Sequence, residues 1–150
     1  MLKILVDADS CPVKQEVFRV ARRYSIKVIL FANSVISLPG ENWLEQVVVA
    51  SGLDAADDSI VEQVASQDVV ITGDIPLAAR CLKKGARVLG PHGLVFTENS
   101  IGNALATRDL MTHLRNIGIN TAGQAAFTKK DRSRFLQALD AMIQAMRVNQ

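Results

Sequence analysis

Aspartates gather at three places in this chain where strands are expected to end or helices to begin. Asp7 and Asp9 follow the apolar run KILV, and Asp74 follows VVIT. The third group, within GLDAADDSI, is made up of Asp54, Asp57 and Asp58. Aspartate is a poor former of strands and helix interiors, so these placements favour chemistry or helix capping over packing. Because clustered carboxylates repel one another unless a proton or a cation neutralises them, the pattern indicates a divalent-metal site with oxygen ligands, suited to Mg²⁺ or Mn²⁺.

Helix capping is the competing interpretation for each aspartate taken alone. Asp9 and Asp57 are credible N-caps, and Ser100 is another before a helix expected to begin at Ile101. Asp7 comes directly after an apolar strand, and Asp74 repeats this placement one glycine after VVIT. Together with the group at 54–58 they favour a metal site, since carboxylates gathered in a cleft usually take part in chemistry.

The apolar pattern along the first two thirds alternates between strand and helix periodicity. The expected strands are 3–7, 27–33, 46–50, 68–72 and 86–90, and the expected helices between them cover 13–24, 57–65 and 75–84. Alternation of this kind predicts an α/β fold with right-handed crossovers and a mainly parallel sheet of about five strands, covered on both faces. Ligands of such sheets bind beyond the carboxyl ends of the strands, where Asp7, Asn33 and Asp74 are expected.

The last third has a different character. A loop is expected around 90–100, a helix from 101 to 117, a second loop at 119–128 and then a final helix. The apolar stripe of this final helix, expected to pack in the core, comprises Phe135, Leu136, Leu139, Met142, Ile143 and Met146. Since nothing in the pattern divides the chain, residues 1–150 are expected to form a single domain.

Composition narrows the class of protein. The chain has 150 residues, of which 49% are hydrophobic and 21% charged, enough for a normal core. No apolar run approaches the roughly 18 residues that a membrane span needs, and no signal sequence is recognisable. We therefore expect a cytoplasmic protein without a membrane partner. Cys11 would sit at a helix start that stabilises a thiolate, but no neighbouring histidine could act as its base.

Several other chemistries lack their motifs. His92 and His113 do not have the spacing of a zinc site, and no nucleophile elbow, GxGxxG or P-loop is present. Basic residues do cluster, which leaves a polyanionic partner open. These clusters are Arg19, Arg22 and Arg23; Lys83, Lys84 and Arg87; and Lys129, Lys130, Arg132 and Arg134. Each cluster alone is equally consistent with a solvated helix face.

Four motifs together resemble the bacterial YaiI/YqxD family: DADSCPVKQEV, GLDAADDSIVE, DVVITGDIPLAARCLKKGARVLGP and RDLMTHLRNIGINTAGQAAFTKKDRSRFLQALD. The resemblance covers nearly the whole chain. It implies a three-layer α/β/α, PIN-like domain with two C-terminal helices. In the wider PIN and NYN ribonuclease domains, Asp7 matches the first-strand aspartate, Asp58 the central acid and Asp74 the aspartate of the T-x-D motif. Asp54 and Asp57 are similar to additional acids, whereas Ile75-Pro76-Leu77 departs from the polar and aromatic NYN pattern.

The resulting hypothesis is a divalent-metal-dependent nuclease acting on RNA or another nucleic acid. Asp7, Asp58 and Asp74 would hold Mg²⁺ or Mn²⁺ directly or through water. The remaining acids, which would orient ligands or complete a second site, are Asp9, Asp54 and Asp57. Asn33 would contact water or substrate, and Arg108 and Arg115, on one helix face, would meet phosphates. The alternatives are a non-catalytic domain that binds a metal or a partner, and a metal-dependent phosphatase for a small phosphate ester.

Overall fold

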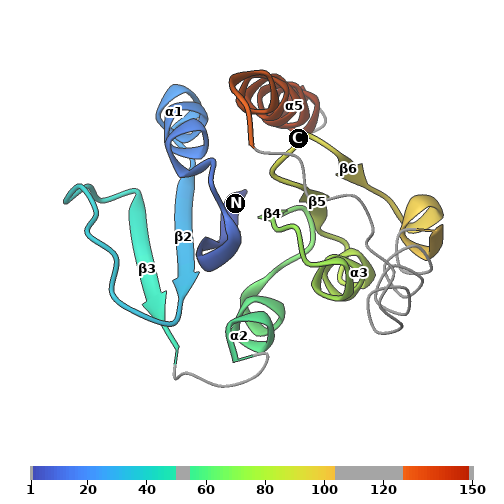
Figure 1. The fold of residues 1–150 in the computed structure, drawn as a ribbon, viewed down its shortest axis with the longest axis horizontal. Helices are drawn as coiled ribbons and strands as arrows, with labels where there is room; N and C mark the ends of the chain where they lie inside the picture. The colour runs from blue at the N-terminus through green and yellow to red at the C-terminus, as the bar shows by residue number, and fades with distance from the viewer. Residues whose placement is uncertain (1, 50–54, 104–126, 149–150) are drawn as a thin grey trace, which may run out of the picture.

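Six strands form one sheet in the order β3-β2-β1-β4-β5-β6 (Figure 1). The structure is a computed structural model that describes residues 2–49, 55–103 and 127–148. The strands are β1 Lys3–Asp7, β2 Lys27–Ala32, β3 Leu44–Val48, β4 Val69–Ile71, β5 Arg87–Leu89 and β6 Val95–Phe96. Every neighbouring pair is parallel except β5 and β6, which are antiparallel. The expected α/β class with a mainly parallel sheet is therefore confirmed.

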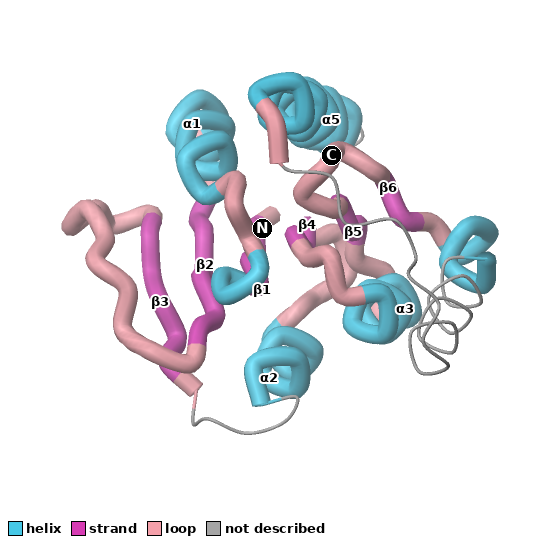
Figure 2. The backbone as a smooth tube through the Cα atoms, in the orientation of Figure 1, coloured by secondary structure: helices cyan, strands magenta, loops and turns pink. Residues whose placement is uncertain are grey.

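Helices cover both faces of the sheet and give three layers (Figure 2). The helices are η1 Ala8–Ser10, a short 3-10 turn, followed by α1 Lys14–Tyr24, α2 Ala55–Gln63, α3 Ile75–Lys83 and α5 Lys129–Val148, and residues 98–103 are also helical. α1 and α5 share one face, while α2 and α3 lie on the other (Figure 1). None of the helices in the described ranges is long and apolar enough to span a membrane.

The strand sequences explain the two cores. Side chains alternate between the faces of a strand, so Ile4 and Val6 pack with α1 and α5, while Leu5 packs with α2 and α3. A parallel strand buried on both faces needs a continuous apolar run, and KILV supplies one. In α5, Phe135, Leu139 and Ile143 are fully buried, so the expected apolar stripe of this helix does pack in the core.

β3, at Leu44–Val48, begins two residues before the strand expected at 46–50, and two details of the last third also differ from the sequence expectations. β6 is a two-residue antiparallel strand where a loop was expected, since two residues carry too little pattern to be recognised. The helix expected from Ile101 begins at residue 98, because Thr97 and Ser100 cap it together. Thr97 Oγ1 accepts a hydrogen bond from the Ser100 N–H at 3.1 Å, and Ser100 Oγ accepts one from the Thr97 N–H at 3.0 Å. The expected end of that helix, and His113, lie outside the described residues.

The connections of β1 and β4 create the place for a site. These two strands are neighbours in the sheet, but the chain leaves β1 through α1 on one face and leaves β4 through α3 on the other. Ligands of open parallel sheets bind where two neighbouring connections diverge in this way, outside the carboxyl ends of the strands. Asp7 ends β1 and Asp74 comes just after β4, so both aspartates lie at this switch point.

Candidate metal and phosphate site

A pocket of about 210 Å³ opens at the switch point and brings together most of the predicted site residues. Its lining consists of Asp7, Asp9, Asn33, Ala55, Ala56, Asp57 and Asp74. These residues come from the end of β1, from η1, from the residue after β2, from the first turn of α2 and from the start of α3. Segments distant in sequence thus deliver four carboxylates and one amide to a single hollow.

Asp7 is the most buried of these acids, with 8% of the residue exposed. The Thr72 hydroxyl donates a hydrogen bond to Asp7 Oδ2 at 3.1 Å and accepts one from the Asp74 N–H at 3.0 Å. Thr72 is 1% exposed, so this bridge lies in the core of the switch point. One hydroxyl therefore fixes the carboxylate of β1 relative to the backbone that follows β4.

Asp74 is the N-cap residue of α3. Its Oδ1 accepts a hydrogen bond from the Leu77 N–H at 3.0 Å, and Pro76 follows within the first turn, where its missing N–H does no harm. The capping and the metal interpretations of this aspartate are compatible, because the cap uses one carboxylate oxygen. Within the described part of the chain, no hydrogen bond involves the other oxygen, Oδ2.

Asp9 ties η1 to the end of β2 instead of capping α1. Its Oδ2 accepts a hydrogen bond from the Asn33 backbone N–H at 3.0 Å, while α1 begins at Lys14 after Val13. Asp9 and Asn33 are both exposed, and both line the pocket. This contact fixes the position of the pocket wall on the β2 side.

The two consecutive acids of α2 point to different places. Asp57 lies in the first turn, beside Ala55 and Ala56, and lines the pocket. The Asp58 side chain is 60% exposed and does not line it, and its Oδ1 lies 2.9 Å from Arg80 Nη1 on α3. Consecutive helical residues are about 100° apart around the axis, so both carboxylates cannot face one hollow. The pocket is thus lined by Asp57, which the sequence placed among the accessory acids, and not by Asp58, which the sequence placed among the direct metal ligands.

The pocket has a strongly one-sided charge. Among the described residues that line it are four aspartates and no lysine, arginine or histidine. The amino ends of α2 and α3, which carry partial positive charge, lie beside these acids and offset part of their charge. Within the described ranges, no three side chains of Asp, Glu, His or Cys approach closely enough to form a ready-made metal cage.

Three expected site residues cannot be placed. Asp54, Arg108 and Arg115 lie outside the described residues. Conversely, Thr72, Ala55 and Ala56 belong to the site but were not singled out. The position of Thr72, two residues before Asp74 at the end of the same strand, is a sequence feature that could have indicated its role. For Ala55 and Ala56 the corresponding feature is their small size directly before an acid at a helix start.

Cys11 has no features of a reactive thiol. Its residue is 6% exposed, and burial raises the pKa of its thiol to about 11. The thiolate is the nucleophilic form, so a thiol with this pKa stays protonated and inert near neutral pH. Burial likewise raises the pKa of Cys81 to about 11, and this residue packs in the core with α2 and α3, as expected.

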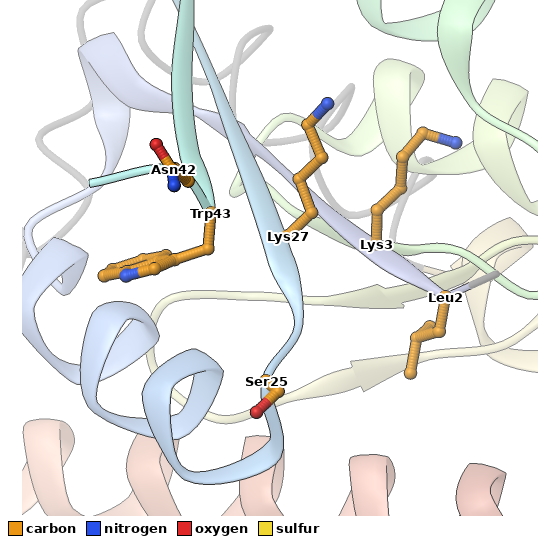
Figure 3. A pocket seen from close by; sticks show the side chains of 6 residues that line it. All are labelled: Leu2, Lys3, Ser25, Lys27, Asn42 and Trp43. Carbon is orange, nitrogen blue, oxygen red and sulfur yellow. The ribbon is translucent and has the colours of Figure 1, made fainter. Parts of the chain in front are cut away.

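A second, more apolar pocket lies at the opposite edge of the sheet. It has about 310 Å³ and is lined by Leu2, Lys3, Ser25, Lys27, Asn42 and Trp43 (Figure 3). Its two lysines come from paired positions of β1 and β2, and each is already in an ion pair, Lys3 with Asp68 at 2.5 Å and Lys27 with Glu45 at 3.0 Å. Although it is larger, this pocket offers no acid or unpaired base for chemistry, so the acidic pocket is the candidate site.

Sequence comparison finds one matching protein family and several similar bacterial proteins. A sequence profile of the uncharacterized YaiI/YqxD family matches residues 5–145. A UPF0178 protein of Paramagnetospirillum magneticum is 55% identical over 149 residues, which cover 99% of each chain. UPF0178 proteins of Rhodospirillum centenum and Parvibaculum lavamentivorans are 52% and 53% identical and cover 98% of this chain. The matches cover 98% of the Rhodospirillum protein and 97% of the Parvibaculum protein.

Proposed function

This chain belongs to the YaiI/YqxD family, whose description names no activity, and from its acidic pocket we propose a divalent-metal-dependent phosphodiesterase acting on RNA or another nucleic acid. The observation that carries the proposal is the convergence of four aspartates from separate segments on one pocket at the switch point of the sheet. Carboxylates gathered in this way repel one another, and a bound cation relieves that repulsion. The PIN-like arrangement and the cytoplasmic location expected from the sequence belong to the same proposal.

The donor set fits Mg²⁺ or Mn²⁺. Carboxylate and amide oxygens are hard ligands, and Mg²⁺ usually keeps several waters while it binds one or two carboxylates directly. Asp7, Asp57 and Asp74, from the end of β1 and the starts of α2 and α3, would hold the cation, one or two of them directly and the rest through bound water. A cation bound there would lower the pKa of a water and offset the charge of the phosphate.

The surrounding residues have separate roles in this proposal. Thr72 keeps Asp7 in orientation through its hydroxyl, and the Leu77 N–H does the same for Asp74. Asn33 would donate its side-chain amide to a phosphate oxygen or to water, with Asp9 holding its backbone. The amino end of α2, with only methyl groups at Ala55 and Ala56, leaves room for a phosphate to approach.

The neighbouring acids of α2 provide the sharpest test. Asp57→Asn should abolish Mn²⁺-dependent hydrolysis of bis(p-nitrophenyl) phosphate and single-stranded RNA, whereas Asp58→Asn, with the same loss of charge, should retain it. Both variants should melt close to the wild-type temperature without metal. Equal activity in the two variants would remove Asp57 from the site. Wild-type protein purified free of contaminating nuclease that cleaves neither substrate with any divalent ion would leave a non-catalytic binding domain as the better description.

A metal-dependent phosphatase is the second candidate, favoured by the limited size of the pocket. A volume of about 210 Å³ suits a single phosphate group better than an extended chain. Hydrolysis of p-nitrophenyl phosphate that greatly exceeds hydrolysis of the diester would favour this candidate. The reverse preference would support the phosphodiesterase.

A further inference from the structure

The amino end of α5 carries three exposed cations. One of them, Arg134, helps to lower the pKa of Asp131 in the same helix, after the hydrogen bonds from Thr128 and together with His92. Lys129 and Lys130 are its first two residues, and Arg134 is one turn later; all three are exposed. Within the described part of the chain, none of them has an ion pair, whereas the neighbouring Arg132 pairs with Glu16 at 3.5 Å. Cations in the first turn of a helix oppose its dipole and reduce stability. Unpaired lysines in this position therefore point to an external anion.

This basic end lies on the same edge of the sheet as the acidic pocket. Arg132 Nη1 donates a hydrogen bond to the Pro12 carbonyl at 2.6 Å, which places the first turn of α5 beside the start of α1. At the other end of the pair, Arg147 lies over the ring of Tyr24, the last residue of α1, so the two helices run parallel (Figure 1). Since α1 follows β1, its amino end, and with it that of α5, lies at the carboxyl ends of the strands.

A loop at 90–93 connects the basic end to the pocket. A Cβ on Gly73, the residue before Asp74, would lie 3.6 Å from Cδ of Pro91. The next residue, His92, is exposed, and its ring lies 4.9 Å from that of Phe127. Gly93, at φ +92°, packs directly on the α5 backbone, where a Cβ would come within 3.1 Å of the Arg134 carbonyl. The loop 90–93 thus lies between Gly73, which precedes Asp74, and the second turn of α5.

We propose that His92, Lys129, Lys130 and Arg134 form a binding track for single-stranded nucleic acid that leads into the acidic pocket. The inference rests on the proposed phosphodiesterase function and names how its substrate is held. A small phosphate ester that fills the pocket has no group to place on the track, because the loop 90–93 stands between them. A chain with a phosphate at every nucleotide would use both, with phosphates on the lysines and a base on the exposed His92 ring.

The track also answers an electrostatic problem of the pocket. Four aspartates line the pocket and disfavour the approach of a polyanion, whereas exposed cations outside the pocket favour it. Lys83 and Lys84 provide a matched comparison, since they lie at the carboxyl end of α3 and hence at the opposite edge of the sheet. A directed track requires the α5 lysines and not those of α3.

Binding of a fluorescent single-stranded RNA 12-mer, measured by anisotropy in EDTA at several salt concentrations, tests the track without relying on hydrolysis. Lys129→Gln/Lys130→Gln should weaken binding and flatten the slope of log K against log salt by about 1.4, for two lost contacts. Lys83→Gln/Lys84→Gln should leave the RNA affinity and the salt slope unchanged. His92→Ala should weaken binding by about fivefold or more. Wild-type binding by the α5 double variant, or equal losses in the two double variants, would overturn the track.

Hydrolysis of bis(p-nitrophenyl) phosphate separates failure of the track from failure of the function. This diester has no flanking phosphates, so Lys129→Gln/Lys130→Gln should cleave it at the wild-type rate while its KM for RNA rises. A wild-type protein that cleaves the diester, combined with unchanged RNA binding by the variant, would reject the track and retain the phosphodiesterase. A wild-type protein that binds RNA through these lysines but cleaves nothing would retain the track and reject the phosphodiesterase.

Discussion

Thr72 holds Asp7 through a buried hydrogen bond of 3.1 Å, and the same hydroxyl accepts the Asp74 N–H. This one side chain therefore links the ends of β1 and β4, the two strands between which the pocket opens. A hydroxyl can do this because its single oxygen donates one hydrogen bond and accepts another, whereas an aliphatic group of the same size can do neither.

Thr72→Val should destabilise the protein by about 1–3 kcal/mol, because it leaves two partly buried polar groups without their partner at nearly constant volume. Thr72→Ser keeps the hydroxyl and should lose much less stability than Thr72→Val. Urea denaturation measures both variants. If Val and Ser are equally stable, the hydroxyl bridge contributes nothing to the fold. In the proposed enzyme, Val should also lower metal affinity, since the carboxylate of Asp7 is no longer oriented.

Mn²⁺ should raise the melting temperature by binding only the folded acid cluster. At about 100 times Kd the gain is about 2.7 kcal/mol, which corresponds to roughly 5–10 °C for a chain of this size. Asp7→Asn should lose most of this shift, while Asp58→Asn, whose carboxylate lies outside the pocket, should keep it. Differential scanning calorimetry with and without Mn²⁺ provides the readout. The same shift in both variants would count against a cation in this pocket.

Asp74 should show separate effects of its cap and its charge. Asp74→Ala removes the oxygen that accepts the Leu77 N–H and should cost about 1 kcal/mol of stability. Asp74→Asn retains a capping oxygen and removes one of four clustered charges, so without metal it should be at least as stable as wild type. In Mn²⁺ the wild-type protein should be more stable than Asp74→Asn. Chemical denaturation in EDTA and in Mn²⁺ measures the comparison.

Stability should fall at alkaline pH because of the buried thiol of Cys11. Burial raises the pKa of this thiol from its ordinary value of 9.0 to about 11, so the folded state keeps the thiol proton more strongly than the unfolded chain does. The resulting stabilisation is complete below about pH 9 and is lost as the pH rises through about 11. Cys11→Ala should flatten the decline of unfolding free energy across this range. If the stability of Cys11→Ala falls as steeply as that of the wild type, other titrating groups cause the alkaline loss of stability.

The lysines at the start of α5 should reduce stability when no anion is bound. Lys129→Gln/Lys130→Gln should raise the free energy of unfolding by about 0.3–1 kcal/mol per residue at low salt, because the change relieves repulsion with the helix dipole. Lys83→Gln/Lys84→Gln, at the carboxyl end of α3, should lower it. Both effects should shrink in 1 M NaCl, where charges are screened. Changes of the same sign in the two pairs would contradict a dipole origin.

The sequence by itself determined which segments form strands and helices and which acidic residues follow the strands. A run such as KILV that is apolar at every position predicts a strand buried on both faces, and the apolar stripe of α5 predicts one buried helix face, because burial imposes these periods locally. The exits of such strands must lie at one edge of a parallel sheet, so Asp7, Asn33 and Asp74 could be expected together from the order of elements alone.

Only the tertiary structure decided which of these groups face one another. Asp57 and Asp58 are adjacent in sequence, and their directions depend on how α2 is rotated against the sheet and α3, which a local pattern does not contain. Thr72 became a bridge because β4 pairs with β1 in one particular register, Ile4 with Val69 and Val6 with Ile71. The same holds for the start of α5, which packs beside the start of α1, at the same edge of the sheet as the pocket, from more than a hundred residues away along the chain. Orientation and long-range pairing are set by the packing of whole elements, and single residues do not encode them.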